Sequence, residues 1–158
     1  MNSEIYLQRT NAEHADFQKL VIKLDKELAI RDGESHAFYH QFNKSKTLQH
    51  IVLAYSNKQV KACGALKHYS DKIVEIKRMF VQESDRGKGI ASLVLKELEN
   101  WAQELNYEKC ILETGENQPE AINLYIKNNY SKIPNYGPYE SIYTSVCFEK
   151  ILSKIESS

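Results

Sequence analysis

Apolar residues recur at helical or strand spacing along most of the chain, so the pattern predicts an alternation of helices and strands. Between residues 12 and 33 the apolar positions lie mostly three and four residues apart, which predicts an amphipathic helix. Its buried face would be formed by Phe17, Leu20, Val21, Leu24 and Leu28. A second helical stretch is expected at 36–42, because Ser35 before it is a residue type that caps helix starts.

Short runs of apolar and β-branched residues predict strands on both sides of these helices. They are expected at 4–8, 49–55 and 59–68, with a final strand within 141–150. The three residues at 56–58, Ser-Asn-Lys, separate two of these runs and favour a hairpin turn.

The middle of the chain, residues 74–105, predicts a strand, a glycine-bearing turn and an amphipathic helix that begins at residue 90. A strand at 109–114 and a helix within 118–130 should follow. Pro119 suits the first turn of that helix, and Asn129 can end it in the left-handed conformation. This order predicts an α/β fold of the α+β kind, with one mixed sheet and helices on both of its faces.

Length and charge limit the classes of function. At 158 residues the chain has the length of a single domain, expected to span 1–158. Lys and Arg number 21, as do Asp and Glu, and no basic block is present, so nucleic acid is not an expected partner. The apolar runs fall short of the roughly 20 residues of a membrane helix, and the first residues lack signal-peptide features. We therefore expect a cytoplasmic protein without membrane contact.

The cysteines are odd in number, and no pair has the spacing of metal ligands, so no metal site is expected. Cys63, Cys110 and Cys147 lie in apolar, strand-like runs. We interpret them as small buried hydrophobic residues; the alternative is a thiol that carries an acyl group.

The turn between the predicted strand and helix reads Arg86-Gly87-Lys88-Gly89-Ile90-Ala91. A helix that starts at such a turn directs unpaired backbone N–H groups and its positive dipole end at a bound anion. The spacing excludes a P-loop, because Lys88 is followed by Gly89 and not by the Ser or Thr that would bind magnesium. A dinucleotide fingerprint is approximated, but its strand lies unusually far along the chain. The pattern Q/R-x-x-G-x-G/A is satisfied at every defined position.

These residues resemble the GNAT superfamily of acyl-CoA-dependent N-acyltransferases. The resemblance continues through the helix at 90–105, the strand at 109–114 and the segment Q-P-E-A-I-N-L-Y-I-K-N-N-Y at 118–130, about half of the chain. It implies a mostly antiparallel mixed sheet flanked by helices, and direct transfer of an acetyl group from acetyl-CoA to a primary amine of a small molecule. Acetylation of proteins or peptides, and a non-catalytic acyl-CoA-binding regulatory module, remain as alternatives.

The resemblance also implies roles for particular residues. Backbone groups in the strand before the turn would hold the pantetheine arm and acyl carbonyl, and the turn would hold the pyrophosphate. The expected cofactor contacts are Met79, Phe80, Val81, Arg86, Gly87, Lys88, Gly89, Ile90, Ala91, Asn117 and Gln118. Gln118 departs from the asparagine that many members carry. Tyr125 matches the tyrosine that protonates the departing sulfur.

The catalytic base has several candidates. Glu75 lies where some members carry a catalytic glutamate, and it could equally be a solvated carboxylate or an ion-pair partner. The competing bases are Glu113, His36, His40 and His68. Acceptor contacts are expected from Arg31, His36, Tyr39, Tyr136 and Tyr139, because the family binds substrate with its first helical pair and its last loop. A homodimer is compatible with all of these features.

Overall fold

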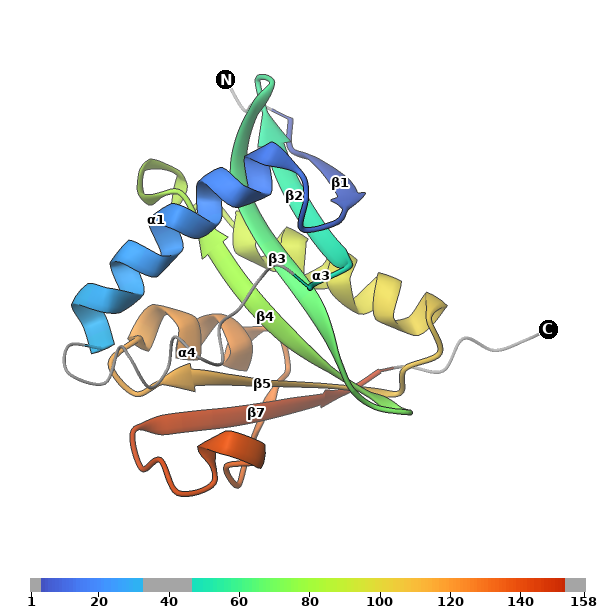
Figure 1. The fold of residues 1–158 in the computed structure, drawn as a ribbon, viewed down its shortest axis with the longest axis vertical. Coiled ribbons are helices and arrows are strands. Elements are labelled where there is room, and N and C mark those ends of the chain that lie inside the picture. Colours follow the sequence, from blue (N-terminus) through green and yellow to red (C-terminus); the bar gives the residue numbers. More distant parts are fainter. Residues whose placement is uncertain (1–3, 33–46, 153–158) are drawn as a thin grey trace. The chain divides into compact units, whose positions relative to one another are not determined.

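The computed structural model describes residues 4–32 and 47–152, and it forms two compact units. The first unit contains the described residues up to Lys67 together with Lys77–Leu98, and the second contains His68–Ile76 and the residues from Glu99 onward. The elements are β1 (Tyr6–Thr10), α1 (Ala15–Asp32), β2 (His50–Ser56), β3 (Gln59–Ser70), β4 (Ile73–Val81), the 3-10 helix η2 (Glu83–Asp85), α3 (Ile90–Glu104), β5 (Lys109–Gly115), α4 (Pro119–Lys127), β6 (Ser131–Ile133), the 3-10 helix η3 (Gly137–Tyr139) and β7 (Ser145–Ile151) (Figure 1). Hydrogen-bonded strands follow the order β1-β2-β3-β4-β5-β7-β6, which is a mixed sheet.

Antiparallel pairing organises the first unit. β1 pairs with β2 from Tyr6 opposite Tyr55 to Thr10 opposite Ile51, and β2 continues into β3 through a tight hairpin. Asn57 and Lys58 occupy the hairpin turn with φ of 53° and 64°. Two successive left-handed residues match the twist of the flanking strands, and this explains the short connection.

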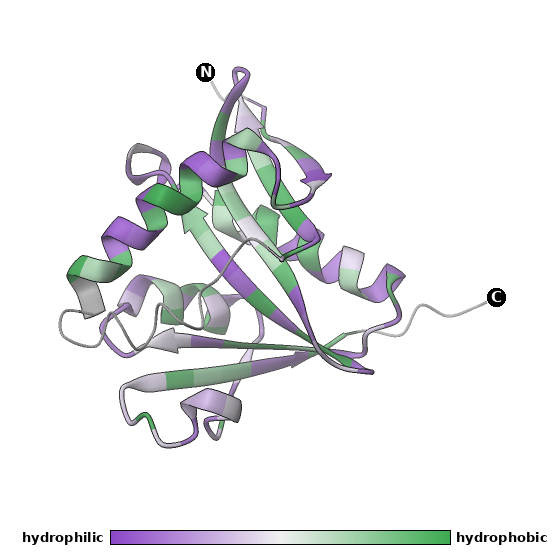
Figure 2. Ribbon diagram, viewed as in Figure 1, coloured by the Kyte–Doolittle hydropathy of each residue, from purple (hydrophilic) through white to green (hydrophobic). Residues whose placement is uncertain are grey.

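Helices cover both faces of β3 in the first unit. On one face, Cys63 and Ala65 join the apolar side of α1 in a buried cluster with β2 and Phe80 of β4. On the other face, Gly64 leaves no space for a side chain: an added Cβ would lie 2.5 Å from Met79 Sδ, 2.8 Å from Leu98 Cδ1 and 2.9 Å from Val94 Cγ1. Hydrophobic and hydrophilic residues alternate along α1 in Figure 2, as expected for a helix with one face on the core.

In the second unit, β5 lies between the start of β4 and β7. Ile73, Val74 and Glu75 pair in parallel with β5, and β5 pairs antiparallel with β7 along its whole length. A buried polar network closes this unit: Tyr130 donates to Glu99 Oε2 at 2.9 Å, and Lys150 donates to Glu99 Oε1 at 2.8 Å. Because both carboxylate oxygens of Glu99 have partners, this buried charge is compensated.

The sequence pattern located most of these elements. The helix predicted from residue 12 is α1, the two central strands and their turn form the β2–β3 hairpin, and Asn129 ends α4 with φ of 71°. The final strand begins only at Ser145, because residues 137–144 form η3 and successive turns. β6 was not predicted, and the helix expected at 36–42 lies outside the described residues. None of the described helices has the length and apolar character needed to cross a membrane.

Candidate active site

The glycine turn forms an open backbone cradle at the start of α3. Gly87 and Gly89 have φ of 79° and 80°, a region that favours glycine, and a Cβ added to either would meet nothing within 4 Å. α3 begins at Ile90, and the N–H groups at the start of a helix precede the first carbonyls with which they could pair inside it. These conformations and the free space suit close approach of a phosphate group.

The Arg86 side chain is held by the protein and does not point freely into the cradle. Its Nε donates to the Val81 carbonyl at 2.9 Å, its Nη2 donates to Glu27 Oε2 at 2.7 Å, and its guanidinium lies 5.4 Å from the centre of the Phe80 ring. Arg86 therefore fastens the turn to β4 and α1. The backbone of the turn remains the part of the cradle that is available to an anion.

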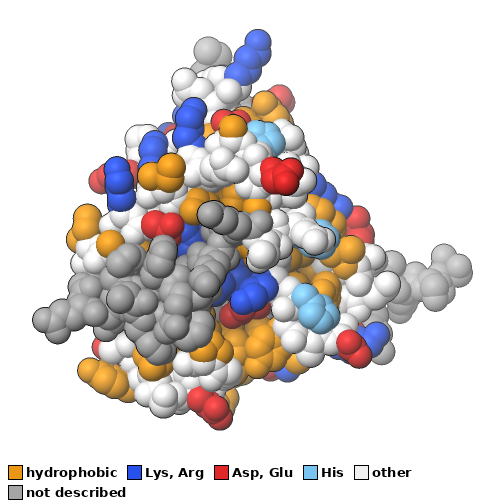
Figure 3. Space-filling model, in the orientation of Figure 1, with side chains coloured by type: hydrophobic (Ala, Val, Ile, Leu, Met, Phe, Trp, Pro, Cys, Tyr) orange, Lys and Arg blue, Asp and Glu red, His pale blue; other side chains and the backbone are white. Residues whose placement is uncertain are grey.

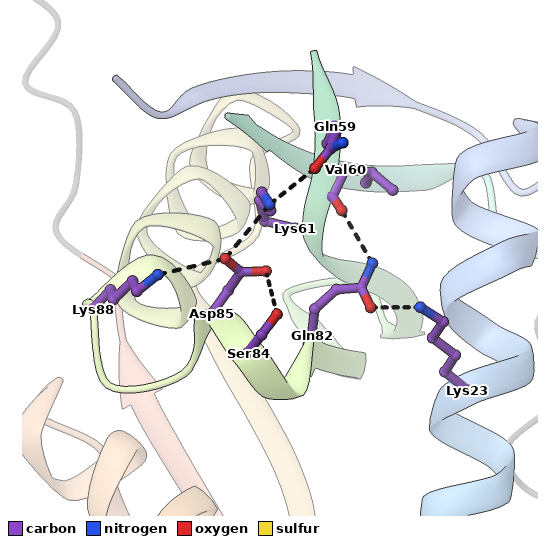
Figure 4. A network of polar contacts seen from close by, with 8 residues as sticks. All are labelled: Lys23, Gln59, Val60, Lys61, Gln82, Ser84, Asp85 and Lys88. Atoms are coloured by element: carbon purple, nitrogen blue, oxygen red, sulfur yellow. Dashed lines mark hydrogen bonds and ion pairs between the residues drawn. The ribbon is translucent and has the colours of Figure 1, made fainter. Parts of the chain in front are cut away.

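A polar network supports the turn from the β4 side (Figure 4). Asp85 is buried, and its Oδ1 lies 3.6 Å from both Lys61 Nζ and Lys88 Nζ. Gln82 accepts from Lys23 Nζ at 2.6 Å and donates to the Val60 carbonyl at 3.3 Å. The negative charge of Asp85 is thus balanced before any anion binds. Nothing in the sequence pattern distinguished Asp85 from an ordinary loop carboxylate.

Arg78 interrupts the regular course of β4 just before the predicted cofactor segment. Its φ of 57° is left-handed, its carbonyl accepts from the Cys63 thiol at 3.3 Å, and the register between β4 and β5 ends at Glu75 opposite Ile111. A left-handed residue inside a strand breaks the pleat, as in a β-bulge.

In the segment predicted to hold the pantetheine arm, the side chains of Met79 and Phe80 pack into the protein. Met79 faces Gly64 and α3, and Phe80 belongs to the cluster beneath α1. Whatever this segment contributes to a ligand must therefore come mainly from its backbone.

Tyr125 is buried in α4 against other aromatic rings. Its ring centre lies 5.7 Å from that of Tyr130 and 6.1 Å from that of Phe148. Burial, reinforced by the charge of Glu113, raises the pKa of Tyr125 well above its ordinary value. The phenol is therefore protonated at neutral pH, which a proton donor requires.

The two carboxylates considered as bases have different partners. Glu75 is 5% exposed, and its Oε2 accepts a hydrogen bond from the Tyr136 hydroxyl at 2.6 Å. Glu113 Oε2 accepts from Ser145 Oγ at 2.7 Å. His68, the histidine candidate within the described residues, contacts the Tyr107 hydroxyl through Nδ1 at 2.7 Å.

Two tyrosine rings pack against Tyr136, the hydrogen-bond partner of Glu75. The Tyr136 ring packs edge-on against Tyr69 at 5.5 Å and against Tyr139 at 5.8 Å. Tyr136 and Tyr139 were predicted to contact the acceptor, and the structure brings them together with Glu75. Tyr69 was missed, because its position at the end of β3 gave no sign of contact with a loop more than sixty residues away.

The remaining residues predicted to contact the cofactor or the acceptor can be located only by the element or connection that carries them. Asn117 and Gln118 lie between β5 and α4, where the Gln118 N–H donates to the Gly115 carbonyl at 3.0 Å. Arg31 lies in the last turn of α1. His36, Tyr39 and His40 lie outside the described residues.

The cysteines are not arranged for acyl transfer. All three are buried with free thiols, and burial raises the pKa to about 12 for Cys63, about 12 for Cys110 and about 11 for Cys147. A thiol must ionise to act as a nucleophile, so these pKa values oppose that role.

Across residues 4–32 and 47–152, no three His, Cys, Asp or Glu side chains gather in a metal-binding arrangement.

The sequence profile of the acetyltransferase (GNAT) family matches residues 14–130, which include the glycine turn, α3, β5 and α4. The chain belongs to the GNAT family of acetyltransferases. This membership confirms the resemblance found in the turn and in the Leu-Tyr helix.

Proteins described as acyltransferases resemble the chain along nearly its whole length. An IAA acetyltransferase of Azospirillum brasilense is 30% identical over 149 residues, covering 90% of this chain and 97% of that protein. A Klebsiella pneumoniae structure assigned to the acyl-CoA N-acyltransferases superposes with a TM-score of 0.81 at 24% identity, covering 96% of this chain and all of that one. A GNAT acetyltransferase of Elizabethkingia anophelis with acetyl-CoA bound has a TM-score of 0.69 at 19% identity, covering 96% of this chain and 100% of that one. The GNAT fold is thereby confirmed.

Proposed function

We propose that this GNAT protein transfers the acetyl group of acetyl-CoA to a primary amine of a small molecule, directly and in a ternary complex. The observation that carries the proposal is the open cradle at Gly87 and Gly89, whose left-handed backbone and free space suit a pyrophosphate at the start of α3. The acetyl-CoA in the Elizabethkingia anophelis structure supports this choice of cofactor. Acyl transfer as the reaction class follows from the family.

In this proposal the cofactor is held mainly by backbone. Residues from Arg86 to Ala91 bind the pyrophosphate, and main-chain groups of Met79, Phe80 and Val81 bind the pantetheine arm and the acyl carbonyl. Asn117 and Gln118 add contacts to the cofactor. The side chains that support the turn, Arg86 and Asp85, already have protein partners, so the cradle is formed before the ligand arrives.

The chemistry requires a neutral amine and a protonated leaving group. Glu75 accepts a proton from the ammonium, and the freed lone pair of the nitrogen forms the N–C bond to the acyl carbon while the C–S bond breaks. Tyr125 gives its proton to the thiolate, and the second proton released by the amide nitrogen returns to Tyr125 through water. Positioning supplies much of the remaining rate, because a thioester is already activated.

The acceptor is proposed from two supporting observations. The net charge is zero, and acidic and basic side chains are interspersed on the face drawn in Figure 3, so a strongly charged polymer is not favoured. Arg31, His36, Tyr39, Tyr136 and Tyr139 remain the proposed acceptor contacts. A single functional domain, a cytoplasmic location and a homodimer remain predictions from the sequence.

Calorimetry with acetyl-CoA, ATP and NAD tests the cofactor. Acetyl-CoA should bind with a Kd far below those of ATP and NAD, and equal weak binding of all three would contradict the proposal. Gly89→Arg should abolish binding by filling the cradle. Gly89→Ala is the matched control: it carries the same backbone strain, about 1 kcal/mol, but leaves most of the space free.

A thiol-release assay tests the acceptor with acetyl-CoA, a panel of small amines and a panel of peptides that carry N-terminal or lysine amines. Turnover with small amines supports the proposal. Turnover with peptides alone would identify a protein acetyltransferase, and tight acetyl-CoA binding without any turnover would identify a regulatory module.

A further inference from the structure

The Glu75 carboxylate accepts a hydrogen bond from one tyrosine hydroxyl. The Tyr136 hydroxyl donates to Glu75 Oε2 at 2.6 Å, a length typical of a hydrogen bond to a charged oxygen. Among the side-chain nitrogen and oxygen atoms of residues 4–32 and 47–152, Arg78 Nε alone is both fully buried and without a partner. Glu75 is 5% exposed, and within those residues its Oε1 has no hydrogen bond, so no described side chain holds this oxygen.

The Tyr136 ring is itself fixed by the loop that carries it. Tyr69 and Tyr139 pack edge-on against it, and Tyr139 is 2% exposed within η3. Asn135 Nδ2 donates to the Ile142 carbonyl at 2.8 Å and so closes the loop around this residue. A hydroxyl on a ring held from two sides can point in one direction without a further loss of freedom.

The groups around Glu75 keep their protons near neutral pH. Burial, followed by the charge and hydrogen bond of Glu75, raises the pKa of Tyr136 far above its ordinary value. The Cys147 thiol, which also senses the charges of Glu113 and Glu75, has a pKa raised to about 11, chiefly by burial. Tyr139 lies on the loop side of Tyr136, and Glu113 is bound by Ser145. Tyr136 is therefore a hydrogen-bond donor throughout the pH range of an assay.

We propose that Tyr136 is a positioning residue for acetyl transfer: it fixes Oε2 of Glu75 and thereby presents Oε1 to the amine of the acceptor. The inference rests on the proposed function, and it replaces direct substrate contact as the main role of the Tyr136 hydroxyl. In the step concerned, an N–H bond of the ammonium breaks, its electron pair stays on nitrogen, and the proton forms an O–H bond at Oε1. The donor on Oε2 stabilises the charged carboxylate that this step requires.

The test compares Tyr136→Phe with Tyr143→Phe. Both variants lose one hydroxyl from the same connection between β6 and β7, but Tyr143 is 89% exposed. In Tyr136→Phe, kcat/KM for the acceptor should fall about tenfold, and the acidic limb of its pH profile should move up by about one pH unit, because the charged carboxylate loses a donor. The Kd of acetyl-CoA should not change. Tyr143→Phe should match the wild type in all three measurements.

A substrate-free measurement separates this inference from the proposed function. The ¹³C carboxyl signal of Glu75, assigned by its loss in Glu75→Gln, should change its chemical shift in Tyr136→Phe at pH 7. An unchanged signal, or an unchanged acidic limb together with unchanged kcat/KM, would overturn the role of Tyr136. A wild-type protein that acetylates no amine would instead overturn the proposed function, whatever the carbon signal shows about the hydrogen bond.

Discussion

Arg78 and Asp25 form an ion pair, with Arg78 Nη2 2.5 Å from Asp25 Oδ1, that joins the left-handed residue of β4 to α1. The Arg78 side chain is 1% exposed, whereas the Asp25 side chain is 32% exposed. Because a guanidinium does not lose its proton in proteins, Asp25 is needed to compensate a buried charge. Arg78 Nε has no partner within the described residues, so the compensation is already incomplete.

Asp25→Asn should therefore destabilise the fold. After allowance for the exposure of Asp25, we expect a loss of about 1 to 3 kcal/mol in the free energy of unfolding, measured by urea denaturation. In an Arg78→Met background the same change should cost less than about 0.5 kcal/mol, because no buried charge is left unpaired. Equal losses in the two backgrounds would show that the pair is not coupled. Asp71→Asn, at an exposed turn, serves as the surface control.

Tyr125→Phe tests the proton donor. The variant keeps the ring that packs against Tyr130 and Phe148 and removes only the hydroxyl. We expect kcat to fall by about 10²-fold or more while the Kd of acetyl-CoA is unchanged, as for a group that acts in the transition state. An unchanged kcat, in conditions where pre-steady-state kinetics show that chemistry limits turnover, would remove Tyr125 from the mechanism.

The raised pKa of Tyr125 has a consequence for the alkaline side of the profile. A proton donor must keep its proton, and burial moves the ionisation of this phenol above its ordinary value of about 10. The wild-type rate should consequently show no decline from Tyr125 ionisation up to about pH 10. A tyrosinate absorbance that develops below that pH and is lost in Tyr125→Phe would contradict this.

Glu75→Gln tests the base. The amide keeps the size of the side chain but cannot accept a proton, so the acidic limb of the pH profile of kcat/KM should disappear and the rate should fall. Glu113→Gln is the matched comparison, because Glu113 also accepts a hydroxyl hydrogen bond at 2.7 Å. If the limb survives in Glu75→Gln and is lost in Glu113→Gln, the assignments are exchanged; survival in both would point to a histidine or water.

Direct transfer predicts intersecting initial-rate lines when acetyl-CoA and amine concentrations are varied. With a thiol pKa of about 12, Cys63 and Cys110 would be ionised in only about 10⁻⁴ of molecules at pH 8. Cys63→Ala and Cys110→Ala should therefore keep the rate, apart from any loss of stability from their buried positions. Parallel lines, together with inactivity of one folded variant, would indicate an acyl-enzyme.

The sequence was informative where local chemistry determines structure. Asn57 tolerates the left-handed turn, and Gly87 and Gly89 adopt the positive φ that the phosphate pattern requires. Arg78 could not be predicted in the same way, because this buried, left-handed arginine depends on its ion-pair partner Asp25, far away in the sequence. β6 is three residues long and carries too short a pattern to detect.

In the candidate site, too, features that depend on neighbouring residues were predicted, and contacts between residues distant in the sequence were not. The turn and Tyr125 were found because their neighbours in the sequence form a recognisable pattern. The contact of Glu75 with Tyr136 joins residues 61 positions apart, so only the fold brings it about. The turns between Tyr139 and Ser145 were missed because Ile142, Tyr143 and Thr144 are residue types common in strands. In the structure, hydrogen bonds such as Ser145 N–H to the Ile142 carbonyl, at 3.0 Å, turn the backbone there.

Gly64 has no side chain, and this allows Met79 of the proposed cofactor-binding segment to pack against it. Any added methyl group would have to displace Met79, Leu98 or Val94, and Met79 belongs to the backbone segment proposed to hold the pantetheine arm. A library selected for acetyl-CoA binding would therefore include position 64 among its sensitive sites, although glycine there offers no group to a ligand. Variation at this residue in natural or evolved chains would change cofactor affinity through the packing of two layers, not through recognition.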